Sequence, residues 1–386
     1  MAATWWTKSS ELDKKQLEVV SLPLDGDFLV LGPAGSGKTN LLLLRAAFLH
    51  KNGRHDIAVF TFGRVLKEFL ATGSVHYPFS TDKIQTCMRW GAALLNANGI
   101  AFDGKGSFAE TRTELFAGLK HLASQGLDEN KLDCILIDEA QDYSGEEIEI
   151  IFSFADQVFA VGDSRQRINN VSGGLDRLET KCISTVKLED HYRNGRRICR
   201  LADGIRNSVD LEDGLESHSK YDESEFESTV KSFPGLSIKQ QCDLATAEIA
   251  TQLLAYPDEL IGIISPRQEE LNDAWSYISG SQISGDCQIQ QFSGGYAPFD
   301  PDRRVIVTTI HGAKGLEFRA LHILGTDKIT KFPTQKNMAY TAVTRCKTSL
   351  RIYHDGSLPG YLEKGLASLE SAPITLASID DLFSGE

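Results

Sequence analysis

Residues 28–49 constrain the fold of this chain most strongly, because a glycine-rich turn there joins two apolar runs. The turn reads GPAGSGKT and fits the pattern G-x-x-x-x-G-K-[ST], with FLVL before it and LLLLRAAFL after it. Between a strand and a helix, such a turn points backbone N–H groups at phosphate oxygens, and the helix adds the positive end of its dipole. We therefore predict a phosphate-binding loop that contacts ATP through Gly32, Pro33, Ala34, Gly35, Ser36, Gly37, Lys38 and Thr39.

Two acids follow another apolar run, CILI at 134–137, at the point where a parallel sheet gathers its polar groups. Taken alone, Asp138 and Glu139 would more often be a helix N-cap pair. Beside a phosphate loop, we instead expect Asp138 and Thr39 to hold Mg²⁺. We expect Glu139 to orient or deprotonate the attacking water, since hydrolysis needs a base near the γ-phosphate.

Short aliphatic runs alternate with helical stretches along the chain, which predicts an α/β fold with mainly parallel sheets. Strand-like runs occupy residues 28–31, 57–60, 134–137 and 158–161 in the first half, and 184–188, 260–264, 304–309, 320–324 and 349–353 in the second. At about 150 residues per domain, 386 residues suggest two or three domains, with a boundary near residue 190. The predicted domains are residues 1–190, with a small helical insertion at about 92–133, and residues 191–386, with an acidic insertion at about 207–230.

Composition excludes several classes of protein. With 41% hydrophobic and 24% charged residues, the chain is globular rather than disordered. Its longest aliphatic run, Leu41 to Leu44, is far short of the roughly 20 apolar residues of a membrane span, so we expect no membrane partner. The first residues lack the apolar core of a secretory signal, and seven cysteines without CxxC spacing indicate reduced thiols. We therefore expect a cytoplasmic protein.

The charge distribution gives one indication of a partner. A formal net charge of −13 argues against a protein that coats nucleic acid without specificity. Between Arg303 and Arg351, however, ten Lys and Arg residues occur with only two acids, Glu317 and Asp327. That segment predicts a track for a polyanion, whereas the acidic run at 210–227 is typical of a solvated face.

With the two motifs in place, residues 16 to about 353 resemble a superfamily 1 helicase of the UvrD/Rep/PcrA type, through an ordered series of motifs. IDEAQD at 137–142 has the form of that family's Mg²⁺ motif, and VGDSRQRI at 161–168 is similar to its G-D-x-x-Q-x-I motif. The resemblance implies that Gln16 reads adenine and that Gln166 senses the γ-phosphate.

Two segments of the first half lie where the family contacts its nucleic-acid strand, TFGRVLKEFL at 61–70 and IQTCMRWG at 84–91. The resemblance implies DNA contacts at Thr61, Phe62, Thr86 and Trp90. For Phe62 and Trp90, the alternative that each ring simply packs in the core is at least as good.

The second half carries three further motifs of the same family. LEDHYRN at 188–194 resembles the fourth, which implies that Tyr192 stacks on adenine and Arg193 reaches the γ-phosphate. MAYTAVTRCK at 338–347 resembles the sixth, with Arg345 as a second arginine finger. VTTIHGAKGLEF at 307–318 is close to the fifth, which implies nucleotide contacts at Gly315 and Glu317 and DNA contacts at Thr309, His311 and Lys314.

The resemblance implies two tandem RecA-like P-loop domains, and electrostatics favours the same arrangement. A phosphate loop in one domain leaves the charge that develops on the γ-phosphate open on one side, where guanidinium groups from another element can stabilise it. Arg193 and Arg345 can do so only when the domains close, so we expect ATP binding to be coupled to closure.

The chain departs from the family in two respects. After Gln166 the family has an aromatic-rich stretch, Y-x-W/F-R-G, whereas this chain has NNVSG at 169–173. Loss of a stacking platform, worth roughly 1 to 3 kcal/mol per base, weakens the grip on a strand. The short spacings at 92–133 and between Phe318 and Met338 also leave no room for large inserted subdomains.

Two functions from different classes remain open. The first is an ATP-dependent DNA helicase or translocase that moves on single-stranded or tailed DNA, with 3′-to-5′ polarity implied by the resemblance. The second is a nucleotide-dependent regulatory ATPase subunit that gates a partner nuclease or effector, for example in antiviral defence, with little unwinding. A P-loop kinase of a small metabolite is a weak third, because nothing in that class needs motifs four to six.

Overall fold

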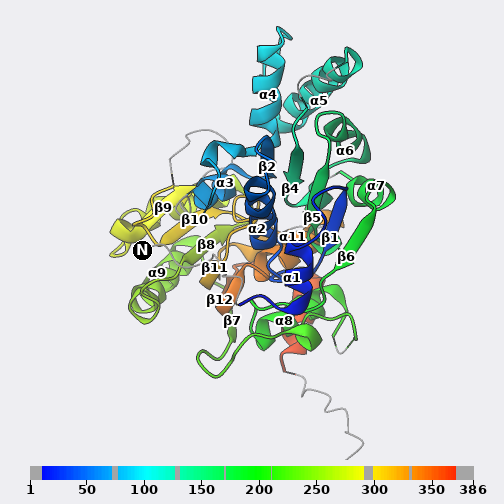
Figure 1. Cartoon of the computed structure of the whole chain (residues 1–386). Helices are drawn as coiled ribbons and strands as arrows, with labels where there is room; N and C mark the ends of the chain where they lie inside the picture. The colour runs from blue at the N-terminus through cyan, green and yellow to red at the C-terminus, as the bar shows by residue number, and fades with distance from the viewer. Residues whose placement is uncertain are drawn as a thin grey trace, which may run out of the picture.

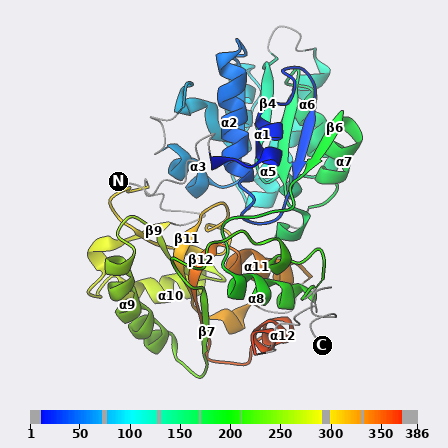
Figure 2. The same cartoon turned by 60° about the horizontal axis from the view of Figure 1, so that its bottom comes forward.

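The fold consists of two lobes, each a six-stranded sheet flanked by helices (Figure 1, Figure 2). The computed structural model describes residues 11–71, 77–126, 131–168, 171–209, 211–290, 299–329 and 333–370. Every ladder that joins two of the named strands is parallel. The prediction of an α/β fold with two mainly parallel, RecA-like sheets is therefore confirmed.

The first sheet has the strand order β3-β2-β4-β5-β1-β6. Residues of β2, β4 and β5 are buried without interruption, as expected of strands covered on both faces. The strands are β1 (Phe28–Leu31), β2 (Ile57–Thr61), β3 (Ile84–Thr86), β4 (Cys134–Ile137), β5 (Val158–Gly162) and β6 (Ser184–Lys187). The α-helices of this lobe are α1 (Lys14–Val20), α2 (Lys38–Lys51), α3 (Arg64–Ala71), α4 (Cys87–Ala97), α5 (Phe108–Ser124), α6 (Gly145–Phe152) and α7 (Gly174–Lys181).

The second sheet has the strand order β7-β12-β11-β8-β10-β9. Its strands are β7 (Thr229–Phe233), β8 (Ile261–Ser265), β9 (Cys287–Gln290), β10 (Val305–Thr309), β11 (Phe318–Ile323) and β12 (Cys346–Tyr353). Its α-helices are α8 (Arg196–Arg206), α9 (Ile238–Ala255), α10 (Gln268–Ile278), α11 (Pro333–Val343) and α12 (Gly360–Ser368). Short 3₁₀ turns are η3 (Thr81–Lys83), η4 (Ala140–Asp142), η5 (Ser164–Gln166), η6 (Glu216–His218), η7 (Ser284–Asp286) and η8 (Thr326–Lys328).

The strands that the sequence did not mark, β3, β7 and β9, all lie at sheet edges. Edge strands face solvent along one side and tolerate polar residues, such as IQT in β3 and CQIQ in β9, so no apolar run identifies them. One assignment needs correction. The run at 184–188, counted with the second half, forms β6, which pairs with β1 at the edge of the first sheet.

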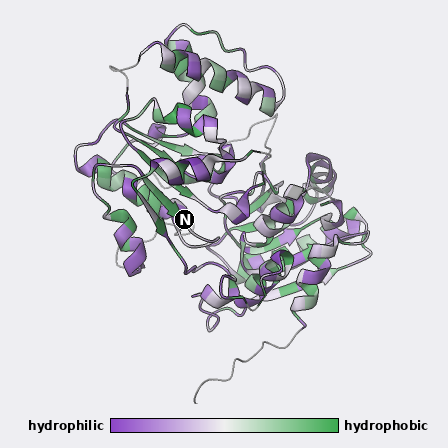
Figure 3. Cartoon of the chain, turned by 90° about the vertical axis from the view of Figure 1, so that its right-hand side faces the viewer, coloured by the Kyte–Doolittle hydropathy of each residue, from purple (hydrophilic) through white to green (hydrophobic). Residues whose placement is uncertain are grey.

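A cluster of buried apolar side chains extends through both lobes. It contains Val30 in β1, Leu41 in α2, Leu66 and Leu70 in α3, and Leu316 just before β11. The strands are largely hydrophobic, and hydrophilic residues lie mainly on the helices and loops around them (Figure 3). The two lobes are thus held together by apolar packing as well as by the connecting chain.

Helices α4 and α5 project from the first lobe, away from the second (Figure 1). They overlap the segment where the sequence predicts a helical insertion. Arg112 of α5 fastens the insertion to α6, because its guanidinium donates to both carboxylate oxygens of Glu147, at 2.6 and 2.7 Å. The predicted domain boundaries and insertion limits stay predictions. None of the helices in the described ranges has the length and apolar character of a membrane span.

Candidate nucleotide site between the lobes

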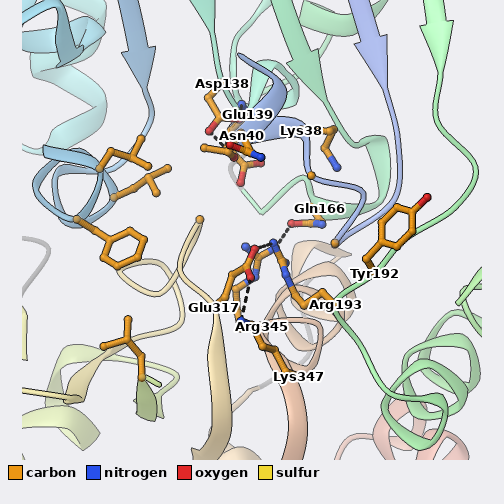
Figure 4. A pocket seen from close by; sticks show the side chains of 18 of the residues that line it. Lys38, Asn40, Asp138, Glu139, Gln166, Tyr192, Arg193, Glu317, Arg345 and Lys347 are labelled. Carbon is orange, nitrogen blue, oxygen red and sulfur yellow. Dashed lines mark hydrogen bonds and ion pairs between the residues drawn. The ribbon is translucent and has the colours of Figure 1, made fainter. Parts of the chain in front are cut away.

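A cavity of about 410 Å³ lies between the two lobes (Figure 4). In this view, Lys38 and Asp138 lie above it and Arg193 and Arg345 below it. Predicted site residues that line the cavity are Gln16, Gly35, Gly37, Lys38, Thr39, Asp138, Glu139, Gln166, Tyr192, Arg193, Gly315, Glu317 and Arg345. The remaining predicted residues of the glycine-rich turn, all within the described ranges, lie outside the lining: Gly32, Pro33, Ala34 and Ser36.

The glycine-rich turn requires glycine at two positions. Gly35 and Gly37 have φ angles of 77° and 83°, in the left-handed region. A Cβ added at Gly35 would also lie 2.6 Å from the Cβ of Arg193. The backbone N–H of Tyr192 donates to the carbonyl of Gly35 at 3.1 Å. The segment that leads into the second lobe therefore lies directly on the turn.

Lys38, at the start of α2, folds back over the turn. Its Nζ donates to the carbonyls of Gly32, at 2.8 Å, and Pro33, at 2.6 Å. Burial lowers the pKa of Lys38, while Asp163 and Glu139 oppose that shift. The lysine thus holds the turn in place through bonds that phosphate oxygens could replace.

Gln16 and Tyr192 lie beside the turn. Gln16 is buried, and its Nε2 donates to the carbonyl of Ser36 at 3.1 Å. Its Oε1 accepts from the backbone N–H of Asp13 in the capping box that begins α1. The hydroxyl of Tyr192 donates to Asp13, and this tyrosine is 41% exposed. The structure thus brings an accessible ring and a buried amide to the same loop.

Thr39 and Asp138 form the pair of oxygens predicted to hold a metal. The Thr39 hydroxyl donates to Oδ2 of Asp138 at 2.9 Å. Burial, followed by the nearby Glu139, raises the pKa of Asp138 to about 7. A hydroxyl and a carboxylate this close fit Mg²⁺, which prefers oxygen ligands and keeps several waters. In the described ranges no group of three or more His, Cys, Asp or Glu forms a larger metal centre.

Glu139 has an unusual backbone conformation, with a φ of 52°. A non-glycine residue in this region costs about 1 to 3 kcal/mol, and such strain clusters at functional sites. Its carboxylate accepts from Nε2 of Gln141 and lies 3.4 Å from Nζ of Lys314. Although burial would raise its pKa, Lys314 and Arg345 hold the pKa of Glu139 below the ordinary value. The carboxylate is therefore ionised and lines the cavity.

Two guanidinium groups reach the cavity from the other side. Arg345 donates to Oε1 of Gln166, whose Nε2 donates to Oδ2 of Asp163 at 2.9 Å. Arg193 donates to Glu317, and its buried Nε has no hydrogen-bond partner among the described residues. Burial, followed by Arg193, lowers the pKa of Arg345 to about 10, so this group remains a cation at neutral pH.

The cavity also has lining residues that the sequence did not indicate, Lys347 and Asn40. Lys347 lies 3.7 Å from Glu317, and although burial would raise the pKa of Glu317, Arg193 and Lys347 lower it to about 2. Asn40 is buried, and its Oδ1 has no hydrogen-bond partner in the described part of the chain. Their positions in the sequence could have indicated both residues: Lys347 lies two residues after Arg345, and Asn40 directly follows the glycine-rich turn.

Comparison with known families agrees with this geometry. A family model of the AAA domain matches residues 11–221, and one of the UvrD-like helicase C-terminal domain matches residues 304–353. The chain belongs to the UvrD-like, superfamily 1 helicase-type ATPases. The first match covers more than half of the chain and contains the glycine-rich turn, and the second contains Arg345. No curated protein matches the chain.

Several strand contacts expected in a UvrD-like helicase are buried in this structure. Thr61 and Thr309 are at most 5% exposed. The Thr309 hydroxyl accepts from the backbone N–H of Gly312 at 3.1 Å, and the Thr86 hydroxyl caps α4 by accepting from the backbone N–H of Arg89 at 3.2 Å. These hydroxyls shape turns of this helicase-type ATPase, and their predicted DNA contacts stay predictions.

The two aromatic candidates differ in their surroundings. The ring of Trp90 packs against Phe60, at 5.0 Å between centroids, and Phe154, at 5.4 Å, which favours the core alternative. Phe62 lies near two cations, with Arg112 at 5.5 Å and Lys314 at 5.8 Å from its ring centroid. Positions 169–170 of the aromatic-poor stretch lie outside the described residues.

The last two strand candidates are His311 and Lys314. His311 is partly buried, and burial, followed by Lys314, lowers its pKa. Lys314 is only 4% exposed, and its ammonium donates to Asp142 of the first lobe. In this conformation the Lys314 ammonium is buried against the first lobe, and its predicted DNA contact stays a prediction.

Several cations of the basic segment 303–351 pair with acids of the same chain, and its role as a track for a polyanion stays a prediction. Arg319 and Lys347 pair with Glu259, and Arg351 pairs with Glu248. Other pairs are Arg303 with Asp300, Lys314 with Asp142 and Lys328 with Asp327. Among the described residues, acids from elsewhere in the chain pair with five of its cations, which a local count of charges cannot reveal.

Proposed function

We propose that this helicase-type ATPase hydrolyses ATP in the cavity between its lobes and uses the cycle to translocate on single-stranded DNA, with 3′-to-5′ polarity. The observation that carries the proposal is the composition of the cavity wall. A phosphate-binding turn and two acids come from one lobe, and two arginines come from the other side. Such a division makes hydrolysis depend on how the lobes sit together.

The residues divide the work as follows. The turn and Lys38 bind the β- and γ-phosphates of ATP, while Gln16 and Tyr192 hold the adenine. Thr39 and Asp138 hold Mg²⁺, which when bound neutralises charge on the phosphate oxygens.

Hydrolysis then proceeds at the γ-phosphate end of the cavity. Glu139 accepts a proton from the attacking water, whose oxygen bonds to the γ-phosphorus as the bond to the β–γ bridging oxygen breaks. Gln166, Arg193 and Arg345 stabilise the charge that spreads over the γ-phosphate oxygens. The products are ADP and inorganic phosphate.

ATP must displace internal partners to bind in this way. Lys38 is bonded to two backbone carbonyls, Arg193 to Glu317, and Arg345 to Gln166. The triphosphate replaces these partners with stronger, charge-assisted bonds. Because Arg345 and Gln166 belong to different lobes, the exchange changes the contact between them, and this is the proposed origin of movement along a strand.

A second candidate, a regulatory ATPase subunit that gates a nuclease or effector, is favoured by one observation. The cations of the segment 303–351 are mostly paired within the chain, and Thr61, Thr309 and Lys314 are buried. A strand would then have fewer groups to bind, while nucleotide-driven changes between the lobes would persist.

The two candidates are separated by the ATPase rate with and without single-stranded DNA, followed by unwinding of duplexes with a 3′ or a 5′ tail. Lys38→Ala, which removes the phosphate-binding ammonium, is the inactive control and should lose turnover by about 100-fold or more. Strong stimulation by DNA, with unwinding of the 3′-tailed duplex alone, supports the motor. An ATPase rate that does not change with DNA supports the regulatory subunit. A wild-type chain that does not hydrolyse ATP contradicts both candidate functions.

A further inference from the structure

Lys314 belongs to the second lobe by sequence but makes its polar contacts with the first. Its ammonium donates to Oδ2 of Asp142 and, at 3.2 Å, to the backbone carbonyl of Gln166. It also lies 3.4 Å from Oε2 of Glu139. An ammonium has three N–H donors and no acceptor, so these three oxygens can satisfy it completely.

The loop between β10 and β11 is built to deliver this side chain. It makes a helical turn directly after β10, with the N–H of Ala313 donating to the carbonyl of Thr309 at 2.9 Å. Ala313 and Leu316, on either side of Lys314, are fully buried and belong to the apolar cluster that joins the lobes. The loop on both sides of Lys314 is thus held by core packing, which places the ammonium against the first lobe.

The first lobe forms the binding site for the Lys314 ammonium. Asp142 is fully buried in η4, three residues after Glu139. The ring of Phe62 lies 5.8 Å from the ammonium and covers it on one side. The guanidinium of Arg112 donates to the backbone carbonyl of Asp142 at 2.8 Å, which fixes the position of that residue.

We propose that Lys314 is an interdomain positioning residue for ATP hydrolysis, which holds the Glu139 carboxylate toward the γ-phosphate only while the two lobes are docked. This inference rests on the proposed ATPase function. It explains a buried cation where a strand contact is expected, because a lysine that faced DNA would remove the ammonium that now pairs with the buried Asp142 carboxylate. The second lobe then positions the Glu139 base of the first lobe, in addition to supplying the two arginines.

The test compares Lys314→Met with the wild type for two quantities, the kcat of hydrolysis and the Kd of a fluorescent ATP analogue. Misplacing Glu139 should lower kcat by about 10- to 100-fold, while the Kd changes by less than about threefold, because Lys314 lies outside the cavity lining and itself binds no phosphate. Arg351→Met is the matched control, since it removes another buried cation of the second lobe, paired with Glu248 at 2.6 Å outside the cavity lining. Its kcat per folded molecule should match the wild type.

A double-mutant cycle with Asp142→Asn supplies the second readout. If Lys314 acts through the acids, the kcat losses of Asp142→Asn and Lys314→Met are not additive in the double variant. The double variant also leaves fewer unpaired buried charges. If Lys314→Met fails to fold, the kcat of the double variant is compared with that of Asp142→Asn instead.

Three outcomes overturn the inference: an unchanged kcat in Lys314→Met, a Kd for ATP that weakens in proportion to kcat, or additive losses in the cycle. Retained DNA-free turnover together with weaker DNA binding would make Lys314 a strand contact instead. Each of these can occur while the wild type still hydrolyses ATP, so they leave the proposed function standing. A wild-type chain without turnover overturns both.

Discussion

Gly315 shows how closely a single residue constrains the contact between the lobes. Its φ is 85°, which favours glycine, and it lines the cavity between the lobes. A Cβ added at this position would overlap the side chain of Leu66 in α3 of the first lobe. The second lobe can therefore approach α3 this closely only because the residue after Lys314 has no side chain.

Gly315→Ala should consequently impair both stability and turnover. Gly53→Ala is the matched control, because Gly53 has nearly the same φ, 88°, but an added Cβ there meets nothing within 4 Å. The control should lose about 1 kcal/mol of unfolding free energy, from backbone strain alone, and keep its ATPase rate. Gly315→Ala should lose about 1 to 3 kcal/mol and lower kcat as well. Urea unfolding measures the unfolding free energy, and a steady-state assay measures the ATPase rate. Equal losses in the two variants would contradict the close contact between Gly315 and Leu66.

At the scale of single residues, the sequence predicts which residues belong to the site better than it predicts where their side chains point. The motif patterns indicate the residues that line the cavity from Gln16 to Arg345, because spacing within a loop is local information. The pattern around Lys314 cannot tell whether that side chain faces a strand or the first lobe. Its partner, Asp142, is 172 positions away in the chain, and only the packing of the two lobes brings the pair together.

Among the secondary-structure elements, β11, β12 and α9 are joined by a buried histidine. His322 in β11 is fully buried. Its Nε2 donates to Oε1 of Gln252 in α9 at 2.9 Å, and its Nδ1 accepts from the hydroxyl of Tyr353 in β12 at 2.9 Å. Burial, followed by Arg351, lowers the pKa of His322 to about 3. The folded protein therefore keeps this imidazole neutral.

The unfolding free energy should decrease as the pH is lowered through a window set by the pKa of His322. Between pH 6.5 and about 3, the unfolded chain protonates His322 and the folded chain does not, so the unfolding free energy decreases as pH falls. The slope from one such group is at most about 1.4 kcal/mol per pH unit. His191, with a pKa lowered to about 4 mainly by burial, adds a slope of the same sign.

His322→Gln removes this contribution while keeping polar atoms in the site. The slope of unfolding free energy against pH, measured by urea unfolding between pH 4.5 and 6.5, should be smaller in the variant by nearly one proton. An identical slope would mean that His322 is already protonated in the folded protein or does not titrate on unfolding.

Sequence patterns predicted the interior strands because those are buried on both faces and read as apolar runs. They missed β3, β7 and β9, whose exposed sides admit polar residues. They also gave a cationic track for residues 303–351, although Glu248 and Glu259 lie on or near other elements and neutralise part of it. Charge pairing of this kind depends on tertiary structure, and no local pattern encodes it.

Across the whole molecule, one group of contacts between the lobes involves η5 and the residue that follows it. Arg345 donates to Gln166, Nδ2 of Asn337 donates to the carbonyl of Arg167 at 2.9 Å, and Arg165 lies 3.4 Å from Asp213. The segment that would sense the γ-phosphate is thus the same segment that docks the second lobe. This arrangement suits a motor and a regulatory ATPase equally, because both need nucleotide state to alter the contact between lobes.

The central claim, one ATP site completed by both lobes, is tested most directly by Arg345→Ala. The measurement is single-turnover ATP hydrolysis, combined with the Kd for ATP of the same variant. Because an arginine finger acts mainly on the transition state, the rate should fall by about 10³-fold or more while Kd stays within about threefold. A variant that hydrolyses ATP at the wild-type rate would contradict this claim, because Arg345 would then take no part in catalysis.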